Sequence, residues 1–471
     1  MGAPASPWEN RAMAHAAYWN EELETRPWHE VQEWQAGRIE RMLPGVRTRS
    51  AMYAKLYADL PADIRIPAFA DLRRLPFTLK DHVRAAQDAA TDARPLGANQ
   101  CAPLEDIVQT LCSSGTTGRP LYYAMTQPDL EVFTDAIAHT WHTAGIGRGD
   151  VVAHLVGLPM VAGGLPYADG FRRVGATLCW LGGFPTDRIL REMRRLRVTA
   201  VLATTSFALH LADQWRHEGG DAGIDSRLAK VLCGGEPGLN QPTVRERVTR
   251  GLDIGHLRET MGLGDVLPSM WAECEAQDGM HFNAQRYVAI ELIDPDTGEV
   301  VPWRDGAIGE IVYTAFEREA TPLLRYRSRD HAVVTGMRCA CGRTSPRIRC
   351  IGRTDDMLIY KGMNVFPTAI RDLVTSRFAG QVEPILRAWR EHPGQVRFDE
   401  PIAVDVETVA GFDPAKAAML ARSIEAEIRT HLQVRVAVTV LPFGSLPRGT
   451  YKNAILAGPH RGLIEQTGRT P

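Results

Sequence analysis

The sequence has 471 residues, of which 44% are hydrophobic and 23% are charged, and its formal net charge is −2. This length indicates two or three domains, and the composition is that of a globular protein rather than a disordered or fibrous one. The balanced charge gives no reason to expect nucleic acid or an anionic membrane as a partner.

The N-terminal segment MGAPASPWENRAMAHAAYW lacks the apolar core of a signal peptide, and no apolar run approaches the ~20 residues needed to cross a bilayer. The eight cysteines are too sparse for a disulfide scaffold, so they are interpreted as thiols or metal ligands. We therefore expect a cytoplasmic protein with no membrane partner.

The first hundred residues carry helical patterns such as WNEELETRPWHEVQEWQAGRIERML. From Val108 onward, short apolar runs alternate with helix-like segments such as RILREMRRLR. The runs VVAHLVGL, GATLCWLGG, VTAVLATT and AKVLCGG predict buried strands. This alternation predicts an α/β fold with a largely parallel sheet. The later segment YVAIELIDPDTGEVVP predicts a hairpin in a smaller β region.

The pattern changes near residue 355. A strand-like MLIYKG, a helical stretch from Thr368 and the strand-like runs PIAVDVETV and VRVAVTVL, with a helix between them, predict a compact α+β unit. The predicted domains are therefore residues 1–354 and 355–471, joined by a short hinge.

The strongest local signal is CSSGTTGRP, Cys112 to Pro120, which directly follows the apolar run IVQTL. Glycines and hydroxyls in such a turn leave backbone N–H groups free to approach phosphate oxygens. The Gly-Lys-[Ser/Thr] ending of a Walker motif is absent. On loop chemistry alone, a plain Ser/Thr/Gly loop remains the alternative.

SSGTTGRP resembles the phosphate loop of adenylate-forming enzymes, and GGEP, RYRSRD, GRTDD and LPRGTYKN follow in that family's order. The resemblance implies a nucleotide site, an inter-domain pivot at Asp355 and a catalytic lysine at Lys452. The nucleotide-binding residues that it implies are Ser113, Ser114, Gly115, Thr116, Thr117, Gly118, Gly234, Gly235, Glu236, Pro237, Asp330 and Arg353.

Three further segments, YWNEELET, PFTLKDHVR and CACGRTSPRIRCIGRTDDMLIYKGMNVFP, are similar to the phenylacetate–CoA ligase branch of that family. The implied fold is a large α/β N-terminal domain, with mainly parallel sheets and a β region, followed by a small mobile α+β C-terminal domain. The implied reaction activates an aryl or arylacetic acid with ATP, releases pyrophosphate and transfers the acyl group to coenzyme A. A homodimer is also plausible by resemblance.

The residue types suit this chemistry. A carboxylate that attacks the α-phosphorus must overcome repulsion between two anions, which fixed donors and cations offset in the transition state. Lys452 is a compact charge suited to bridging the carboxylate and the α-phosphate. Asp330 is expected to bind the ribose hydroxyls, and Arg353 is expected to act near the nucleotide.

One segment departs from the family pattern. Where relatives carry an aromatic-Gly-x-Ser/Thr-Glu segment, this chain reads MGLGD, Met261 to Asp265. Asp265 stands where the magnesium-binding glutamate is expected and, being one methylene shorter, would hold Mg²⁺ through water. Glu259 is a less favoured substitute.

Two cysteine-containing pairs form a second constellation: Cys274 with His281, and Cys339 with Cys341. Spacing alone leaves simple packing as the alternative, because Cys-x-Cys is tighter than the usual zinc knuckle. Similar ligases carry a Cys…His…Cys-x-Cys set in this region. The resemblance therefore implies a closed tetrahedral zinc site with a structural role.

The acid and coenzyme A sites are also implied by resemblance. The candidate acid-lining residues are Met160, Tyr167, Gly235, Met261 and Leu263, each of which could equally belong to the core. The KGMN segment, with Lys361 and Gly362, would line the path of coenzyme A.

Two alternatives stay open. The same adenylation could precede transfer to an amine, a carrier-protein thiol or another nucleophile, as the Arg371 that replaces a family glutamate cautions. A degenerate, non-catalytic nucleotide-binding protein is the second alternative, motivated by Met261 and Asp265.

Overall fold

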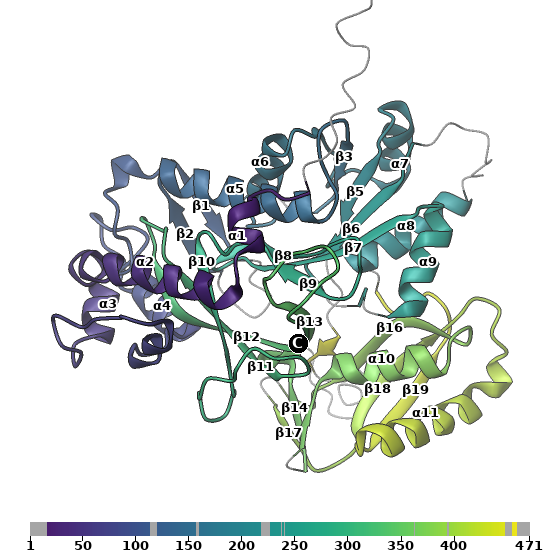
Figure 1. Ribbon diagram of the computed structural model, residues 1–471. Helices are drawn as coiled ribbons and strands as arrows, with labels where there is room; N and C mark the ends of the chain where they lie inside the picture. Colours follow the sequence, from purple (N-terminus) through teal and green to yellow (C-terminus); the bar gives the residue numbers. More distant parts are fainter. Residues whose placement is uncertain are drawn as a thin grey trace, which may run out of the picture.

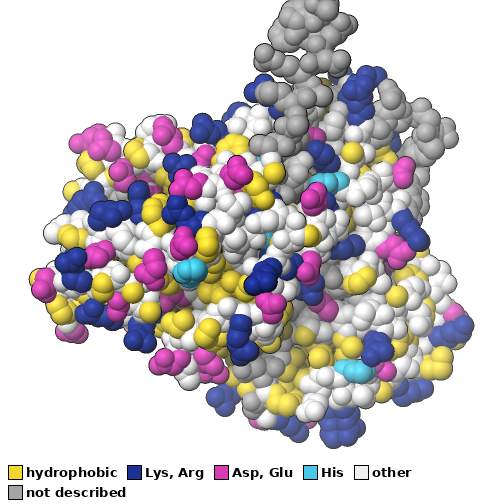
Figure 2. All heavy atoms as spheres, viewed as in Figure 1, with side chains coloured by type: hydrophobic (Ala, Val, Ile, Leu, Met, Phe, Trp, Pro, Cys, Tyr) yellow, Lys and Arg dark blue, Asp and Glu magenta, His cyan; other side chains and the backbone are white. Residues whose placement is uncertain are grey.

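The computed structural model describes residues 17–113, 120–156, 160–217, 227–236, 238–239, 241–361, 363–392, 395–447 and 455–458. Figure 1 shows a large part that holds the elements up to β13 and a smaller part, at the lower right, that holds α10, α11 and β16, β18 and β19. None of the helices in the described ranges is long and apolar enough to cross a membrane. On the face drawn in Figure 2, basic and acidic side chains are interspersed.

Most of the described residues between 20 and 88 form helices, as predicted. Asn20 caps α1 (Glu21–Thr25) by accepting a hydrogen bond from the Leu23 amide at 3.1 Å, and Pro27 separates α1 from α2 (Trp28–Arg49). The next elements are α3 (Ala51–Leu56), η1 (Phe69–Arg74), α4 (Lys80–Asp88), η2 (Leu104–Asp106), and the antiparallel pair β1 (Gln109–Cys112) and β2 (Tyr122–Met125).

The four apolar runs form parallel strands, which confirms the predicted α/β pattern. In the sheet, β4, β3, β5, β6 and β7 are neighbours in that order and all are parallel. Because helices cover such a sheet, its central strands are buried on both faces, as all four residues of β5 are. The strands are β3 (Val151–His154), β4 (Thr177–Trp180), β5 (Ala200–Ala203), β6 (Lys230–Gly234) and β7 (His256–Leu263). The helices are α5 (Gln127–Thr143), α6 (Leu165–Arg173), α7 (Thr186–Arg195), α8 (Thr205–His217) and α9 (Pro242–Leu252).

The same eleven-stranded sheet continues beyond β7 with antiparallel strands only, which form the predicted β region. The hairpin at the DPDTGE turn closes with only an isolated bridge between Ile293 and Val300, and the longer partner of β10 is β11. These strands are β8 (Leu267–Glu273), β9 (Met280–Phe282), β10 (Val288–Ile293), β11 (Ile308–Ala315), β12 (Leu323–Gly336) and β13 (Arg347–Arg353).

The residues after β13 have their own sheets and their own apolar core, and we call the described residues 358–457 the C-terminal lobe. The predicted strands and helices are present there, and β16 is a strand that the sequence reading missed. After η3 (Thr354–Asp356), the lobe contains β14 (Leu358–Tyr360), β15 (Met363–Val365), α10 (Pro367–Arg377), β16 (Val382–Trp389), β17 (Arg397–Phe398), β18 (Ile402–Thr408), η4 (Pro414–Lys416), α11 (Ala417–Leu432), β19 (Val436–Leu441) and β20 (Leu456–Ala457).

Candidate active site

The candidate site gathers where β6 and β7 end, which is where open parallel sheets place their ligands. Gly234 is the last residue of β6, and a Cβ there would lie 2.6 Å from the Thr260 hydroxyl on β7. Gly235 follows with φ +84°, a left-handed conformation that glycine adopts without strain. The two glycines therefore turn the chain closely against β7.

Glu236 is anchored at the start of α8. Its carboxylate accepts a hydrogen bond from the backbone N–H of Ser206 at 2.5 Å. A carboxylate at a helix N-terminus is favoured by the exposed amide groups and the helix dipole. This contact fixes the turn after Gly235, while Pro237 lies outside the described residues.

Asp265 lies in the turn between β7 and β8, and its side chain is almost fully buried. Its Oδ2 accepts a hydrogen bond from the Tyr326 hydroxyl at 2.9 Å and lies 3.7 Å from the Lys80 ammonium. Arg318 donates to its backbone carbonyl at 2.7 Å. Among the described residues, its Oδ1 has no hydrogen-bond partner. Buried polar atoms normally have a hydrogen-bond partner, and a water molecule bound to Mg²⁺ would supply one for this oxygen.

Lys80 is a site residue to which sequence analysis gave no role. The preceding Thr78 forms a parallel bridge with Tyr326, and its amide donates to the Arg325 carbonyl at 2.9 Å. This contact brings the start of α4 to the turn of Asp265. The available signal was the PFTLK segment, but nothing local to it indicates a pairing with β12.

The RYRSRD segment, which lies on β12, contains structural arginines and one carboxylate that faces the end of β13. Arg325 forms a buried, two-fold pair with Glu291, with both N–O distances at 2.9 Å. Arg327 pairs with Glu310. Asp330 lies opposite Arg353 in the β12–β13 ladder, and the two side chains form an ion pair. The structure thus brings together the predicted ribose ligand and the predicted nucleotide-proximal arginine.

Glu259 lies on β7, four residues before Leu263. Burial raises the pKa of its carboxyl to about 7, and the negative charge of Glu273 adds to the effect. Glu273 is paired with Arg245 and also accepts the Glu259 backbone amide at 2.9 Å. Glu259 is therefore a poorer ligand for Mg²⁺ near neutral pH than a fully ionised carboxylate.

The candidate acid-binding residues lie in different environments. Met160 is exposed, whereas Tyr167 belongs to the aromatic core, with its hydroxyl donating to the Pro268 carbonyl at 2.5 Å. Leu263 is buried and Met261 packs against the same core. Tyr167 is thus held within the apolar core, whereas Met160 is not part of that core.

Two loops meet beside these residues. The segment after Met160 is joined to the end of β1, where the Cys112 amide donates to the Met160 carbonyl at 3.0 Å. A Cβ on Gly264 would lie 3.2 Å from the Ala162 methyl group. The small residue at position 264 therefore allows the Met160 loop to approach the MGLGD turn.

Several predicted residues lie outside the described part of the chain: Ser114, Gly115, Thr116, Thr117, Gly118, Pro237, Gly362 and Lys452. Ser113 is described, and its hydroxyl accepts a hydrogen bond from the Leu121 amide at 3.0 Å. Lys361 is exposed at the β14–β15 turn, and Asp355 lies in η3 directly after β13.

The four predicted zinc ligands come together. One ligand atom each from Cys274, His281, Cys339 and Cys341 lies within 4.8 Å of every other. The Cys274–Cys339 sulfur distance is 3.7 Å and the distance from Cys341 Sγ to His281 Nε2 is 3.4 Å. A tetrahedral zinc ion with ordinary bond lengths requires about 3.8 Å and about 3.6 Å between such atoms. The arrangement therefore fits zinc.

The surroundings of this cluster also suit a metal. The Ser345 hydroxyl lies 3.4 Å from His281 Nδ1, on the side of the ring away from the thiols. A hydrogen bond from His281 lowers the pKa of the Cys339 thiol, whereas the hydrogen bond with Cys341 and burial raise the pKa of the Cys274 thiol. Tyr18 donates to the Cys341 carbonyl at 3.1 Å. The N-terminal segment is thus fastened to the cysteine loop.

Comparisons with known proteins show the family and the fold. The family model "AMP-binding enzyme" matches residues 44–315. A phenylacetate–coenzyme A ligase of Thermus thermophilus is 31% identical over 91% of this chain and 96% of its own length. A structure of 2-hydroxyisobutyryl-CoA ligase in the postadenylation state, in complex with 2-HIB-AMP, matches with a TM-score of 0.85 at 24% identity, covering 97% of this chain and 95% of that one. The same ligase in the thioesterification state, in complex with 2-HIB-AMP and CoA, matches with a TM-score of 0.67 at 25% identity, covering 97% and 96%.

Proposed function

Because the chain belongs to the AMP-binding enzyme family, we propose that it is an AMP-forming acid–coenzyme A ligase of the phenylacetate–CoA ligase type. The observation that carries this proposal is the similarity to a phenylacetate–coenzyme A ligase across nearly the whole of both chains. An aryl or arylacetic acid is the proposed substrate.

The proposed reaction has two steps. A carboxylate oxygen of the acid attacks the α-phosphorus of ATP, the bond to the β-phosphate breaks, and pyrophosphate leaves. The coenzyme A sulfur then attacks the acyl carbon, and AMP leaves with the electron pair of the acyl–oxygen bond. In the first step, charge on the α-phosphate is the main cost, and Lys452 is proposed to offset it.

The described residues supply positioning for the nucleotide. Asp330 is proposed to accept hydrogen bonds from the ribose hydroxyls, and its ion pair with Arg353 orients the carboxylate. The close turn at Gly234 and Gly235 would let backbone groups approach the adenine. Asp265 would hold Mg²⁺, and the ion would lower the charge repulsion between the acid and ATP.

The arrangement of the C-terminal lobe is proposed to be that of the adenylation half of the cycle. The supporting observation is the higher TM-score to the postadenylation structure than to the thioesterification structure of the same relative. The proposed boundary and pivot stay at residues 354 and 355, within the short η3.

A zinc ion at Cys274, His281, Cys339 and Cys341 is proposed as a structural component. It would tie β8 and β9 to the loop before β13 and leave no open position for chemistry. We expect about one zinc per chain by metal analysis, and a chelator that strips it should lower the thermal midpoint. Cys101→Ser is the control for zinc content, and it should leave that content unchanged because Cys101 is not one of the four clustered residues. A folded, metal-free protein with unchanged stability would refute the site.

The deciding experiment measures acid-dependent pyrophosphate release across aromatic and aliphatic acids, with and without coenzyme A. Release with arylacetic or aryl acids and formation of the CoA thioester are the expected results. Release that is indifferent to coenzyme A would favour an amine or carrier-protein thiol as acceptor, and no release from any acid would favour a non-catalytic nucleotide-binding protein. A homodimer and a cytoplasmic location stay predictions.

A further inference from the structure

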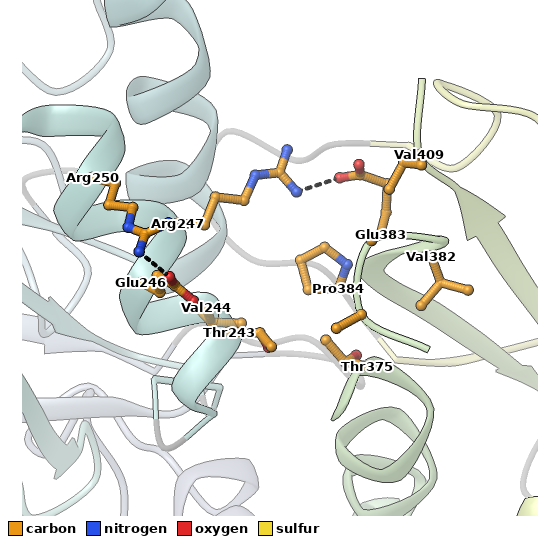
Figure 3. A pocket seen from close by; sticks show the side chains of 12 residues that line it. Thr243, Val244, Glu246, Arg247, Arg250, Thr375, Val382, Glu383, Pro384 and Val409 are labelled. Carbon is orange, nitrogen blue, oxygen red and sulfur yellow. Dashed lines mark hydrogen bonds and ion pairs between the residues drawn. The ribbon is translucent and has the colours of Figure 1, made fainter. Parts of the chain in front are cut away.

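One arginine joins the large part of the molecule to the C-terminal lobe. Arg247 on α9 binds Asp213 of α8 through Nη2 at 2.7 Å and through Nε at 3.3 Å. Its Nη1 donates to Glu383 Oε2, on β16 of the lobe, at 2.7 Å. Figure 3 shows the guanidinium group extending across the gap to Glu383. Asp213 thus orients the guanidinium group of Arg247 so that Nη1 faces Glu383.

The Arg247–Glu383 contact favours one orientation of the lobe, and its acidic partner is buried. The Glu383 side chain is 5% exposed, whereas those of Arg247 and Asp213 are about a third exposed. In this arrangement Arg247 supplies a cation to the buried Glu383 carboxylate, which offsets part of the cost of its desolvation. If the lobe turns away, the Arg247–Glu383 ion pair breaks, while Arg247 keeps Asp213 as its partner. The ion pair therefore stabilises the arrangement in which α9 and β16 lie together. It gives no stabilisation to an arrangement in which they are apart.

The interface around this ion pair is not closely packed. A cavity of about 410 Å³ lies between α9 and the lobe, and it is lined from both sides by residues such as Thr243, Val244, Thr375 and Pro384. Figure 3 shows these side chains facing each other across the opening. The two surfaces are therefore separated by open space at this point, and Arg247 and Glu383, which form the ion pair, are among the residues that line it.

A second contact lies at the N-terminal end of α9. The Gln241 amide donates to Asp372 Oδ1 on α10, and the same oxygen accepts from Arg371 Nη2 at 2.9 Å. A Cβ on Gly238 would lie 3.6 Å from the Arg371 guanidinium. The arginine that replaces the family glutamate therefore lies at the boundary between the lobe and the turn after β6, where its charge also acts on Glu259.

We propose that Arg247–Glu383 and Gln241–Asp372 form a latch that holds the C-terminal lobe in the adenylation arrangement and must open before coenzyme A is used. The inference rests on the proposed two-step function. Arg247 is a positioning residue in this scheme, because it acts on the orientation of the lobe and touches no reacting atom. The latch sets how the enzyme divides its time between the two half-reactions.

The test separates the two half-reactions in Arg247→Met. ATP–pyrophosphate exchange should fall about three- to tenfold, because a smaller fraction of molecules holds the adenylation arrangement. Thioester formation from supplied acyl-adenylate and coenzyme A should stay level or rise. The matched control is Arg250→Met: Arg250 lies on the same helix and pairs with Glu246 of that helix at 2.7 Å, so both rates should stay at the wild-type level.

A second variant guards against a folding defect. Glu383→Gln keeps the side-chain shape and leaves Arg247 with Asp213, so it should lower exchange in the same direction. Equal losses in both half-reactions, or no change in exchange in either folded variant, would overturn the latch. A wild-type enzyme without acid-dependent exchange would instead overturn the proposed function, so the two failures are distinguishable.

Discussion

At the scale of single residues, Asp265 shows how a shorter carboxylate is accommodated. Tyr326 and Lys80 both address Oδ2, while Oδ1 has no partner among the described residues. The side chain is therefore held through Oδ2, whereas Oδ1 is buried without a described hydrogen-bond partner. Glu259, the other candidate, sits where burial raises its pKa to about 7.

We predict that Asp265→Asn raises the Mg²⁺ concentration for half-maximal pyrophosphate exchange by roughly tenfold or more, because the anionic oxygen is lost. A magnesium titration at saturating ATP and acid measures this effect. Glu259→Gln is the matched control and should leave the half-maximal concentration unchanged. The opposite pattern would assign the ion to Glu259.

At the scale of elements, α1 is anchored to the cysteine loop by a buried charge network. Glu24 pairs with Arg343 at 2.6 Å and lies 3.2 Å from His139 Nε2. Burial by itself raises the pKa of Glu24, but the hydrogen bond and charge of His139 and the charge of Arg343 outweigh it and lower the pKa to about 2. The network fixes α1 close to the cysteine cluster.

This lowered pKa has a defined consequence for stability. A carboxyl with a folded-state pKa below its unfolded-state value stabilises the fold above the unfolded value, and the contribution is lost as the pH falls towards the folded value. For Glu24 the window runs from about pH 4.5 down to about pH 2, and the full contribution is about 3 kcal/mol.

We therefore predict that Glu24→Gln lowers the thermal midpoint at pH 6 and that the difference from wild type shrinks as the pH falls below 4.5. Thermal unfolding between pH 6 and pH 3 checks this. Glu22→Gln on the same helix is the control, because Glu22 is 76% exposed and pairs only with Arg26 in the ion pairs described. A pH-independent difference would show that packing rather than charge explains the loss.

At the scale of the whole molecule, the lobe has an apolar core of its own, separate from the two core clusters of the large part. The buried apolar residues after η3 cluster among themselves, and the contacts to the large part include polar ones such as Arg247–Glu383. Such a division allows rotation about a short hinge without exposing a core. The proposed cycle needs this, because Lys452 belongs to the segment that follows β19.

We predict that Lys452→Ala lowers ATP–pyrophosphate exchange by about 10²- to 10³-fold, the size expected for loss of one donor to the transition state. Thioester formation from supplied acyl-adenylate should continue, because that step uses the other arrangement of the lobe. Wild-type-like thermal unfolding would exclude a folding defect. Retained exchange would remove Lys452 from the first step.

Several features follow from the sequence itself. The alternating apolar runs correctly predict β3 to β6, because buried parallel strands are continuously apolar and this property is local. The ordered motifs indicate the family, which the AMP-binding match over residues 44–315 bears out. The Cys and His residues are of the types that bind zinc and therefore indicate a ligand set, although the metal itself stays a prediction.

Other features are decided only by the tertiary structure, because they join residues far apart in the chain. His281 meets the cysteine loop because β9 pairs with β13, and Lys80 reaches Asp265 because Thr78 pairs with Tyr326. Arg247 and Glu383 are each ordinary surface-type charges in the sequence, and the approach of the lobe makes them an ion pair. Residue chemistry and local periodicity are written along the chain, whereas which distant groups meet depends on how the sheet closes and where the lobe rests.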